Sequence, residues 1–357
     1  MRHLLLPLLL LLGLPLPGQA DGFRVYATNE ISGDLSVIDE PAHVQRALIR
    51  LGTRPRGVRI SPDGRLVYVA LSGSPIAGPG VDESKLPPAD RSADGIGVID
   101  AVQLKLLRVL RGVTDPEQIV LSPDGKLLYL ASQDANEVLA LRPASGAIAW
   151  RYHVPFEPEG LGLSPDGKVL LVTEESANSV TILDALTARP LAKIAVGMRP
   201  RGVAFAPDGL HAYVTGEGDA SLAVIDMRTH ALLRTVQVPG AGARPMGVVS
   251  THDGARLYVA TGRGGAVVPV DTQRLEALAP VAVGTRPWGI AVSPDDRYVY
   301  SANGQSNDVS VLDTHTLAVV ARVAVGERPW GVAAGPLPPP AMVGTPSAPG
   351  PAAAPSP

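Results

Sequence analysis

Arginine, glutamate and tryptophan side chains flank a proline that occurs seven times along this chain, usually as Pro-x-Gly. The prolines are Pro55, Pro116, Pro158, Pro200, Pro245, Pro287 and Pro329. The residues before and after them are, in order, Arg54 and Arg56, Asp115 and Glu117, Glu157 and Glu159, Arg199 and Arg201, Arg244 and Met246, Arg286 and Trp288, and Arg328 and Trp330. Guanidinium groups bind carboxylates and stack on aromatic faces, so this set would suit a planar anionic ligand.

The repetition of the arginines also favours a structural role. A side chain that serves nearly every unit of a repeat is more often architectural than a ligand contact. The arginines would then bridge neighbouring units through carboxylates or backbone carbonyls. The differences between units, from Arg to Glu to Trp, are where we expect a function to lie.

Carboxylates gather at two neighbouring units of the repeat, and they could supply oxygen ligands for Ca²⁺. Glu117, Glu159 and Glu175 are the candidates, but no EF-hand-like spacing accompanies them. Solvated loop carboxylates are the commoner outcome, so we expect no metal site. The seven histidines share no spacing and the chain has no cysteine, which disfavours copper and haem ligation and excludes disulfides.

The motif belongs to a longer repeat with a nearly constant period. Successive prolines are 42 residues apart, except for one step of 61 and one of 45. A fixed period of this length is typical of a propeller or a solenoid. Within one unit the sequence predicts four strands, at 202–206, 211–215, 221–226 and 232–238. A tight Pro207-Asp208-Gly209 turn would join the first two.

The first unit lacks the initial strand that every later unit carries. Its predicted strands lie at 24–29, 35–39 and 47–51, whereas an isolated strand at 331–334 ends the repeat region. Three strands from the start and one from the end complete a four-stranded blade and remove the open edges of a ring. The sequence therefore predicts an all-β fold, a seven-bladed β-propeller of four-stranded antiparallel blades, closed by N- and C-terminal strands that share one blade.

One unit departs from the period through an insertion at 72–95. It replaces the connection between the second and third strands of the second blade, which in an antiparallel meander lies on the same face as the Pro-x-Gly connections. Loops of this length without secondary structure are usually functional or disordered. We expect a partner-binding loop here, through its charged residues Asp82, Glu83, Lys85, Asp90 and Arg91.

The two ends of the chain differ in composition from the repeat. Residues 1–20 resemble a secretory signal, with an apolar run followed by small residues before Asp21, and an uncleaved anchor is the alternative. The run is too short for a comfortable membrane span, so we expect a periplasmic protein that does not span the membrane once the signal is cleaved. Residues 21–335 would form the propeller and 336–357 a disordered Pro/Ala-rich tail. The net charge of −3 gives no reason to expect nucleic acid as a partner.

Two stretches carry a family resemblance. Ala212-Tyr213-Val214-Thr215, followed by Ala223-Val224-Ile225-Asp226, resembles the YVTN-type bacterial β-propeller repeat, and this likeness extends over 23–334. The insertion resembles the segment typical of the PQQ-dependent catabolism-associated β-propeller proteins, through Ser72-Gly73-Ser74-Pro75-Ile76, Val81-Asp82-Glu83-Ser84-Lys85 and Ala89-Asp90-Arg91-Ser92-Ala93-Asp94-Gly95-Ile96. The second resemblance implies an exported protein whose genes tend to accompany periplasmic quinoprotein alcohol dehydrogenases, cytochromes c and an ABC transporter. It implies no catalytic residues.

These observations favour a binding or scaffold protein over an enzyme. The connections come from successive blades, so we expect the residues that flank the seven prolines to ring the mouth of the central channel. We expect a periplasmic protein associated with PQQ-dependent alcohol oxidation, which presents this channel mouth to a protein of that system or to a small acidic ligand. The alternatives are a metal-assisted, lactonase-like hydrolase and a docking protein for a cytochrome c. No resident cofactor is expected, although PQQ, a planar tricarboxylate, and Ca²⁺ would both suit the mouth.

Overall fold

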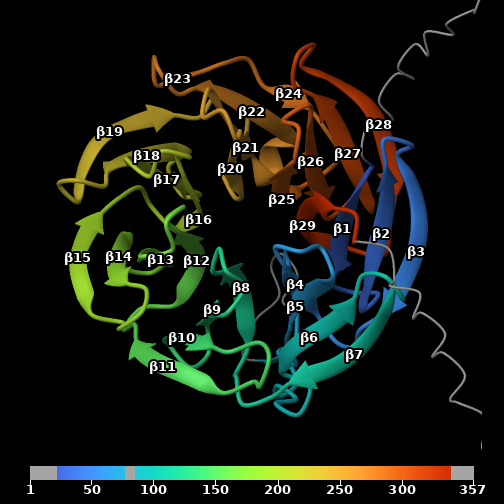
Figure 1. Ribbon diagram of the computed structural model, residues 1–357. Helices are drawn as coiled ribbons and strands as arrows, with labels where there is room; N and C mark the ends of the chain where they lie inside the picture. The colour runs from blue at the N-terminus through green and yellow to red at the C-terminus, as the bar shows by residue number, and fades with distance from the viewer. Residues whose placement is uncertain (1–21, 77–84, 339–357) are drawn as a thin grey trace, which may run out of the picture.

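Seven antiparallel sheets are arranged around a common axis in the computed structural model, which describes residues 22–76 and 85–338 (Figure 1). Each sheet is a blade, with its first strand nearest the axis and its last strand at the rim. The sequence prediction of a seven-bladed, all-β propeller is therefore confirmed. Among the described residues, no helix has the length and apolar character needed to cross a membrane.

The strands follow the chain order blade by blade. The first blade contains β29 (Pro329–Pro336), β1 (Phe23–Asn29), β2 (Asp34–Glu40) and β3 (Val44–Arg50). The second contains β4 (Pro55–Ile60), β5 (Leu66–Leu71), β6 (Gly95–Asp100) and β7 (Lys105–Leu110). The third contains β8 (Pro116–Leu121), β9 (Leu128–Ser132), β10 (Glu137–Leu141) and β11 (Ile148–His153). The fourth contains β12 (Pro158–Leu163), β13 (Val169–Glu174), β14 (Ser179–Asp184) and β15 (Pro190–Ala195).

The remaining blades keep the same order with one irregularity. The fifth contains β16 (Pro200–Phe205), β17 (His211–Gly216), β18 (Ser221–Asp226) and β19 (Ala231–Gln237). The sixth contains β20 (Val248–Ser250), β21 (Arg256–Ala260), the 3-10 turn η2 (Gly262–Gly264) and β22 (Ala266–Asp271). Its outer strand is split into β23 (Glu276–Ala277) and β24 (Val281–Ala282), which both pair with β22. The seventh contains β25 (Pro287–Val292), β26 (Tyr298–Asn303), β27 (Asp308–Asp313) and β28 (Ala318–Ala324).

The two ends of the repeat region share the first blade, as predicted. β29 pairs antiparallel with β1, with Val25 opposite Ala334 and Asn29 opposite Pro329. In Figure 1 the red C-terminal strand lies beside the blue N-terminal one. The Gly331 amide also donates to Thr28 Oγ1 at 2.9 Å. Because β29 supplies the innermost strand, the ring has no unpaired inner edge at this blade.

Packing between blades requires the glycine of the Pro-x-Gly motif, which the sequence alone did not show. A Cβ atom on Gly289 would lie 2.5 Å from the carbonyl oxygen of Trp330, on the inner strand of the next blade. The equivalent glycine of the first blade, Gly331, meets the carbonyl oxygen of Arg56 at the same distance. Gly57, Gly160, Gly202 and Gly247 approach the next inner strand in the same way, whereas the third blade has Gln118 instead of glycine. Neighbouring inner strands therefore approach too closely for a side chain at most of these positions.

Apolar side chains fill the space between facing sheets. One cluster joins the seventh and first blades through residues such as Tyr300 and Val25, and another joins the first and second through Tyr26 and Val58. The outer strands show the alternation of a half-buried strand, as in β3. The inner strand β16 is only half-buried along most of its length because it borders the channel.

Candidate functional site

A cavity of 760 Å³ opens at one end of the propeller, where the connections between blades meet the loops between second and third strands. We call it the mouth cavity. Its lining includes Arg54, Arg56, Glu117, Glu159, Arg199, Arg201, Arg286, Trp288, Arg328 and Trp330. The structure thus brings together these side chains, which the sequence placed at the channel mouth; their role in ligand binding stays a prediction.

One predicted mouth residue, Arg244, does not line the cavity. Its Nη1 donates instead to the carbonyl oxygens of Glu217 and Gly218, at 3.3 and 3.2 Å, on the preceding blade. It therefore bridges two blades through the backbone. This is the structural role that the repetition of the arginines favoured.

The residue before the proline has a left-handed backbone in six of the seven connections. These residues are Arg54, Asp115, Glu157, Arg199, Arg286 and Arg328, with φ between 37° and 59°. The conformation is unfavourable for a residue with a side chain, and the following proline restricts the backbone further. A hydrogen bond from the neighbouring loop fixes it: the Gly304 amide donates to the Arg286 carbonyl at 3.0 Å, and the Glu30 amide donates to that of Arg328 at 2.9 Å. All six residues line the mouth cavity.

Arg56 links the second blade to the third through two buried ion pairs. Its Nη2 lies 2.6 Å from Asp115 Oδ1, and its Nη1 lies 2.7 Å from Glu117 Oε2. Only 1% of the Arg56 side chain is exposed. Ser72 Oγ also donates to Asp115, and the Asp115 amide donates to Asp94 Oδ2 at 3.0 Å. One guanidinium therefore faces two carboxyl groups in a site almost closed to water.

Arg201 forms a similar junction between the fourth and fifth blades. Its Nη1 pairs with Glu159 and lies 2.6 Å from Glu175 Oε2, while its Nε lies 2.8 Å from Glu217 Oε2. Arg199 joins the same group, with its Nη2 2.5 Å from Glu175 Oε1. The acidic half of the mouth thus consists of carboxyl groups that are already paired with arginines.

Burial makes two of these carboxyl groups weak acids. It raises the pKa of Glu117 to about 8 and that of Glu159 to about 7, because the attraction of Arg56 and Arg201 only partly offsets the loss of hydration. Repulsion from Glu159 adds to the pKa shift of Glu117. Burial also opposes the ionisation of Asp115, but the attraction of Arg56, the hydrogen bond from Ser72 and the charge of Arg54 together outweigh it and lower the pKa of Asp115. Glu117 and Glu159 are therefore at least partly protonated near neutral pH.

Two further arginines share the carboxylate of Glu30, which lies in the loop between β1 and β2 of the first blade. Arg54 Nε lies 2.7 Å from Glu30 Oε1, and Arg328 Nε lies 3.1 Å from Glu30 Oε2. Only 3% of the Glu30 side chain is exposed. A single negative charge thus faces two positive ones, so this part of the cavity has an excess of positive charge.

Arg286 differs from the other mouth arginines because it has no carboxylate within 4 Å in the described part of the chain. Its guanidinium carbon lies 5.1 Å from the ring centroid of Trp288. The ring of Trp288 lies 6.0 Å from that of Trp330, at an interplanar angle of 34°. Burial and the neighbouring charges of Arg328 and Arg263 lower the pKa of Arg286. The mouth therefore has a basic and aromatic half, in which one cation lacks a counter-charge.

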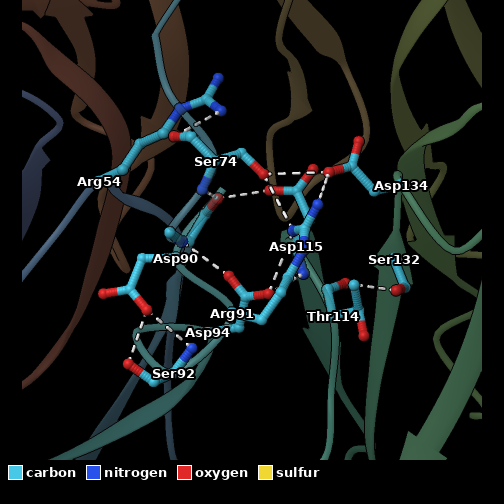
Figure 2. Close-up of polar contacts among 12 residues, drawn as sticks. Arg54, Ser74, Asp90, Arg91, Ser92, Asp94, Thr114, Asp115, Ser132 and Asp134 are labelled. Carbon is cyan, nitrogen blue, oxygen red and sulfur yellow. Dashed lines mark hydrogen bonds and ion pairs between the residues drawn. The ribbon is translucent and has the colours of Figure 1, made fainter. Parts of the chain in front are cut away.

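The insertion borders the mouth cavity and is tied to the third blade. Arg91 Nη2 pairs with Asp134 and its Nη1 lies 3.2 Å from Asp94 Oδ2, while Ser74 Oγ donates to Asp134 at 3.1 Å (Figure 2). At its base the Asp90 amide donates to the Gly73 carbonyl at 2.9 Å. Of the predicted loop residues, Arg91 lines the cavity, Lys85 and Asp90 do not, and Asp82 and Glu83 lie outside the described residues.

The insertion also adds an apolar wall that the sequence analysis did not predict. Ile76, Leu86 and Pro87 line the mouth cavity together with the charged groups. The sequence did contain a signal for this wall, because Ile76 and Leu86 are apolar residues in an otherwise polar loop. Apolar side chains stabilise such a loop only when they pack against another surface. The cavity thus combines arginines, indole rings and an aliphatic surface.

The described residues contain no group of three or more His, Cys, Asp or Glu side chains arranged to hold a metal ion. The three Ca²⁺ candidates, Glu117, Glu159 and Glu175, instead face the guanidinium groups of Arg56 and Arg201. A cation would have to displace these arginines. The geometry therefore favours ion pairs between blades over a calcium site.

Comparisons with known proteins agree with the fold. The profile of the cytochrome D1 heme domain family matches residues 205–332, which run from the fifth blade into the closing strand. Antigen Lp49 of Leptospira interrogans is 29% identical over a match that covers 31% of this chain, and the chain spans about a third of that relative's length. Hydrazine synthase of Kuenenia stuttgartiensis has a TM-score of 0.66 at 20% identity, over 78% of this chain and 89% of its own.

Two further solved structures share the architecture. A candidate 6-phosphogluconolactonase of Bacteroides uniformis has a TM-score of 0.70 at 16% identity, over 88% of this chain and all of its own (100%). The dihydro-heme d1 dehydrogenase NirN, in complex with DHE, has a TM-score of 0.61 at 17% identity, over 87% and 74% of the two chains. These comparisons agree that the protein is a β-propeller. At these identities the structural likeness shows the fold alone.

The partial match to a heme domain raises the question of whether the mouth could hold a haem. Haem iron takes its axial ligands from His, Cys, Met or Tyr. None of these residue types is among the described residues that line the mouth cavity, and none occurs in the eight undescribed residues of the insertion. The mouth therefore does not fit a haem that needs an axial side-chain ligand.

Proposed function

We propose that the protein is an exported binding protein without catalytic activity, which takes a small planar acid in its mouth cavity. We further propose that it serves PQQ-dependent alcohol oxidation, with PQQ as the first ligand to test. This setting is supported by the resemblance of the insertion to that of the PQQ-dependent catabolism-associated propellers. Docking to a periplasmic protein of that system, or to a cytochrome c, stays a prediction.

Arg286 is the observation that carries the proposal. A half-buried guanidinium without a carboxylate partner is electrostatically unfavourable unless a ligand supplies the negative charge. The left-handed backbone of Arg286, at φ 59°, is shared by five other mouth residues, so the missing counter-charge is what distinguishes it. An uncompensated charge of this kind is typical of a functional site.

The surroundings of Arg286 fit a planar acid with a carboxylate at one edge. Arg328 lies close enough to lower the pKa of Arg286, so two positive charges could face one carboxylate. Trp288 is partly exposed and offers an aromatic face for stacking, which a flat ring uses better than a puckered one, while the buried ring of Trp330 lies beside it. The cavity volume of 760 Å³ falls within the usual range for small-molecule sites.

Calorimetric titration of the purified protein with PQQ, with benzene-1,3,5-tricarboxylate and with cyclohexanecarboxylate tests the proposal. We expect the planar acids to bind and the puckered one to bind at least tenfold more weakly. Arg286→Asn keeps a residue that tolerates left-handed backbone and should weaken binding about tenfold or more, as loss of a charged hydrogen bond does. Arg274→Asn, at an exposed turn, is the matched control. Absence of binding by both planar acids, or unchanged binding by the Arg286 variant, contradicts the proposal.

A hydrolase is the second candidate, favoured by the pKa values of Glu117 and Glu159. A carboxyl group whose pKa lies near the working pH is suited to general acid–base catalysis. Against this role, both groups are about 95% buried and paired with arginines. Hydrolysis of δ-valerolactone that is lost in Glu159→Gln, while the binding of planar acids persists, would establish the hydrolase and contradict a purely binding role.

A further inference from the structure

A second charged residue without a counter-charge lies deeper in the channel, at Arg59 on β4. It is the fifth residue of its inner strand, counted from the proline. The equivalent residues of the other blades are Val120, Gly162, Ala204, Val249, Ala291 and Ala333. The second blade thus has an arginine where the other six blades have a small or apolar residue. The difference is visible in the sequence once the blades are aligned.

The contacts of Arg59 leave most of its hydrogen-bonding capacity free. Nη1 donates to the carbonyl oxygen of the adjacent Val58 at 2.7 Å, and no ion pair joins it to the described residues. Burial lowers the pKa of Arg59 to about 10, because no nearby carboxylate offsets the loss of hydration. Arg56, three residues earlier on the same strand, forms ion pairs with two carboxyl groups. Arg56 therefore has counter-charges at ion-pair distance, whereas Arg59 has none among the described residues.

Arg59 lies between two spaces of the channel. Above it is a neck of 80 Å³, bordered by the glycines of the inner strands and by Glu159 and Arg201, which pair with each other. Below it is a cavity of 520 Å³, which reaches the turns at Pro62 and Pro123 on the face opposite the mouth. We call this space the lower cavity. The neck has room for only a few water molecules, so the lower cavity is separate from the mouth.

Most side chains that line the lower cavity are apolar, but Ser122, Ser250 and polar backbone atoms also face it. Arg59 is the only charged residue in its described lining. The wall is formed by side chains such as Ile60, Leu121, Leu163, Phe205, Ile290 and Val292. Such walls cannot hydrate a multivalent inorganic anion, whereas they gain from burying a hydrocarbon chain. One positive charge matches one carboxylate.

We propose that the lower cavity binds an organic monocarboxylate with an apolar body, whose carboxylate pairs with Arg59 and whose chain lies along the apolar wall. The site is independent of the mouth, since its charge, its lining and its opening are all different. A propeller with two sites of this kind could bind a planar acid at one end and an aliphatic acid at the other.

Hexanoate, hexan-1-ol and acetate, titrated into the full-length protein by ligand-observed NMR, test the proposal. We expect hexanoate to bind at least tenfold more tightly than either of the other two, because only hexanoate has both the charge and the chain. Arg59→Val should reduce hexanoate affinity to that of hexan-1-ol, and Arg59→Lys should retain part of the difference. The mouth variant Arg286→Asn should leave hexanoate binding unchanged.

Valine is the natural residue at two of the equivalent positions, so Arg59→Val should fold; Arg59→Gln provides a second neutral variant. Equal affinities for hexanoate and acetate would overturn the proposal in favour of a simple anion site. Hexanoate binding that survives in both neutral variants, or that is lost in Arg286→Asn, would also overturn it. None of these outcomes depends on whether the mouth binds a planar acid.

Discussion

The guanidinium of Arg56, on the inner strand of the second blade, lies 2.6 Å from a carboxylate oxygen of Asp115 on the third blade. Both side chains are at most 2% exposed. Glu117 approaches the same guanidinium at 2.7 Å. A single buried cation thus joins two blades. Its removal would leave two carboxyl groups without a counter-charge in a site that water hardly reaches.

Arg56→Gln should therefore destabilise the protein by about 3–5 kcal/mol, the usual effect of removing one partner of a buried ion pair. Urea denaturation followed by circular dichroism measures it. Arg65→Gln is the control, because Arg65 is 53% exposed and lies 3.9 Å from its partner Asp63; a change below about 0.5 kcal/mol is expected there. A similar loss in the two variants would show that the Arg56 ion pairs do not support the fold.

The pKa values of Glu117 and Glu159 predict a protein that loses stability as the pH rises. Both groups have folded-state pKa values, about 8 and about 7, above the unfolded value of about 4.3. The folded state then binds more protons than the unfolded state, so the free energy of unfolding falls as the pH rises from about 5 to 8. We expect a loss of about 6 kcal/mol across this range, the sum of the two groups titrating independently.

Urea denaturation at several pH values between 5 and 8 measures this slope. Glu117→Gln and Glu159→Gln mimic the protonated forms, so each variant should flatten the profile. The aspartates with lowered pKa, such as Asp124, stabilise the fold above their unfolded pKa and have exerted this effect in full by pH 5. A profile that is flat or rising in the wild type would contradict the raised pKa values.

The repeat predicted the architecture because each unit has the same pattern of strand and turn residues. In the fifth blade the predicted strand at 221–226 coincides with β18, and the predicted strand at 211–215 is one residue shorter than β17. The predicted inner strand at 202–206 begins two residues late, since β16 starts at Pro200. Proline was treated as part of a loop, but at this position its missing N–H does not interrupt the sheet.

Which of the mouth arginines form ion pairs could not be predicted from the sequence. Arg199 and Arg286 both precede the proline of their connections, yet Arg199 faces two carboxyl groups and Arg286 faces none in the described part of the chain. The difference depends on the loops between second and third strands, where Glu175 and Glu217 reach Arg199. The equivalent loop of the seventh blade has Gly304 and Gln305, which carry no charge. A comparison of these loops blade by blade is the signal that would have separated Arg286 from the rest.

The inner-strand glycines make a third prediction, on packing between blades. Gly289→Ala would place a Cβ atom 2.5 Å from the carbonyl oxygen of Trp330, so one of the two inner strands must shift. We expect a loss of about 1–3 kcal/mol, as for other overpacked positions. Gly97→Ala is the control, because its Cβ would meet only flexible leucine side chains at 3.4 Å. Thermal denaturation distinguishes the two; equal melting temperatures would mean that the close approach is not required.

The insertion should be separable from the fold. Replacing residues 75–88 by Gly-Gly keeps Arg91 and Asp94, and the hydrogen bond between Asp90 and Gly73 already closes the base of the loop. We expect little change in melting temperature, but weaker binding of planar acids because the apolar wall of Ile76 and Leu86 is lost. Calorimetric titration with PQQ, with the Arg274→Asn protein as a control, measures the second effect. A large fall in melting temperature would show that the insertion is part of the scaffold.

Closure of the ring through β29 gives the last prediction. Truncation after Arg328 removes the innermost strand of the first blade and leaves the inner edge of β1 unpaired, because β1 pairs with β29 along its length. Neighbouring blades would also lose the contact between Gly331 and the Arg56 carbonyl. We expect loss of cooperative unfolding and a tendency to aggregate through the exposed strand edge. Truncation after Pro338 keeps β29 complete and should leave the melting curve unchanged. A cooperative transition in the shorter protein would show that six complete blades hold the ring without the shared one.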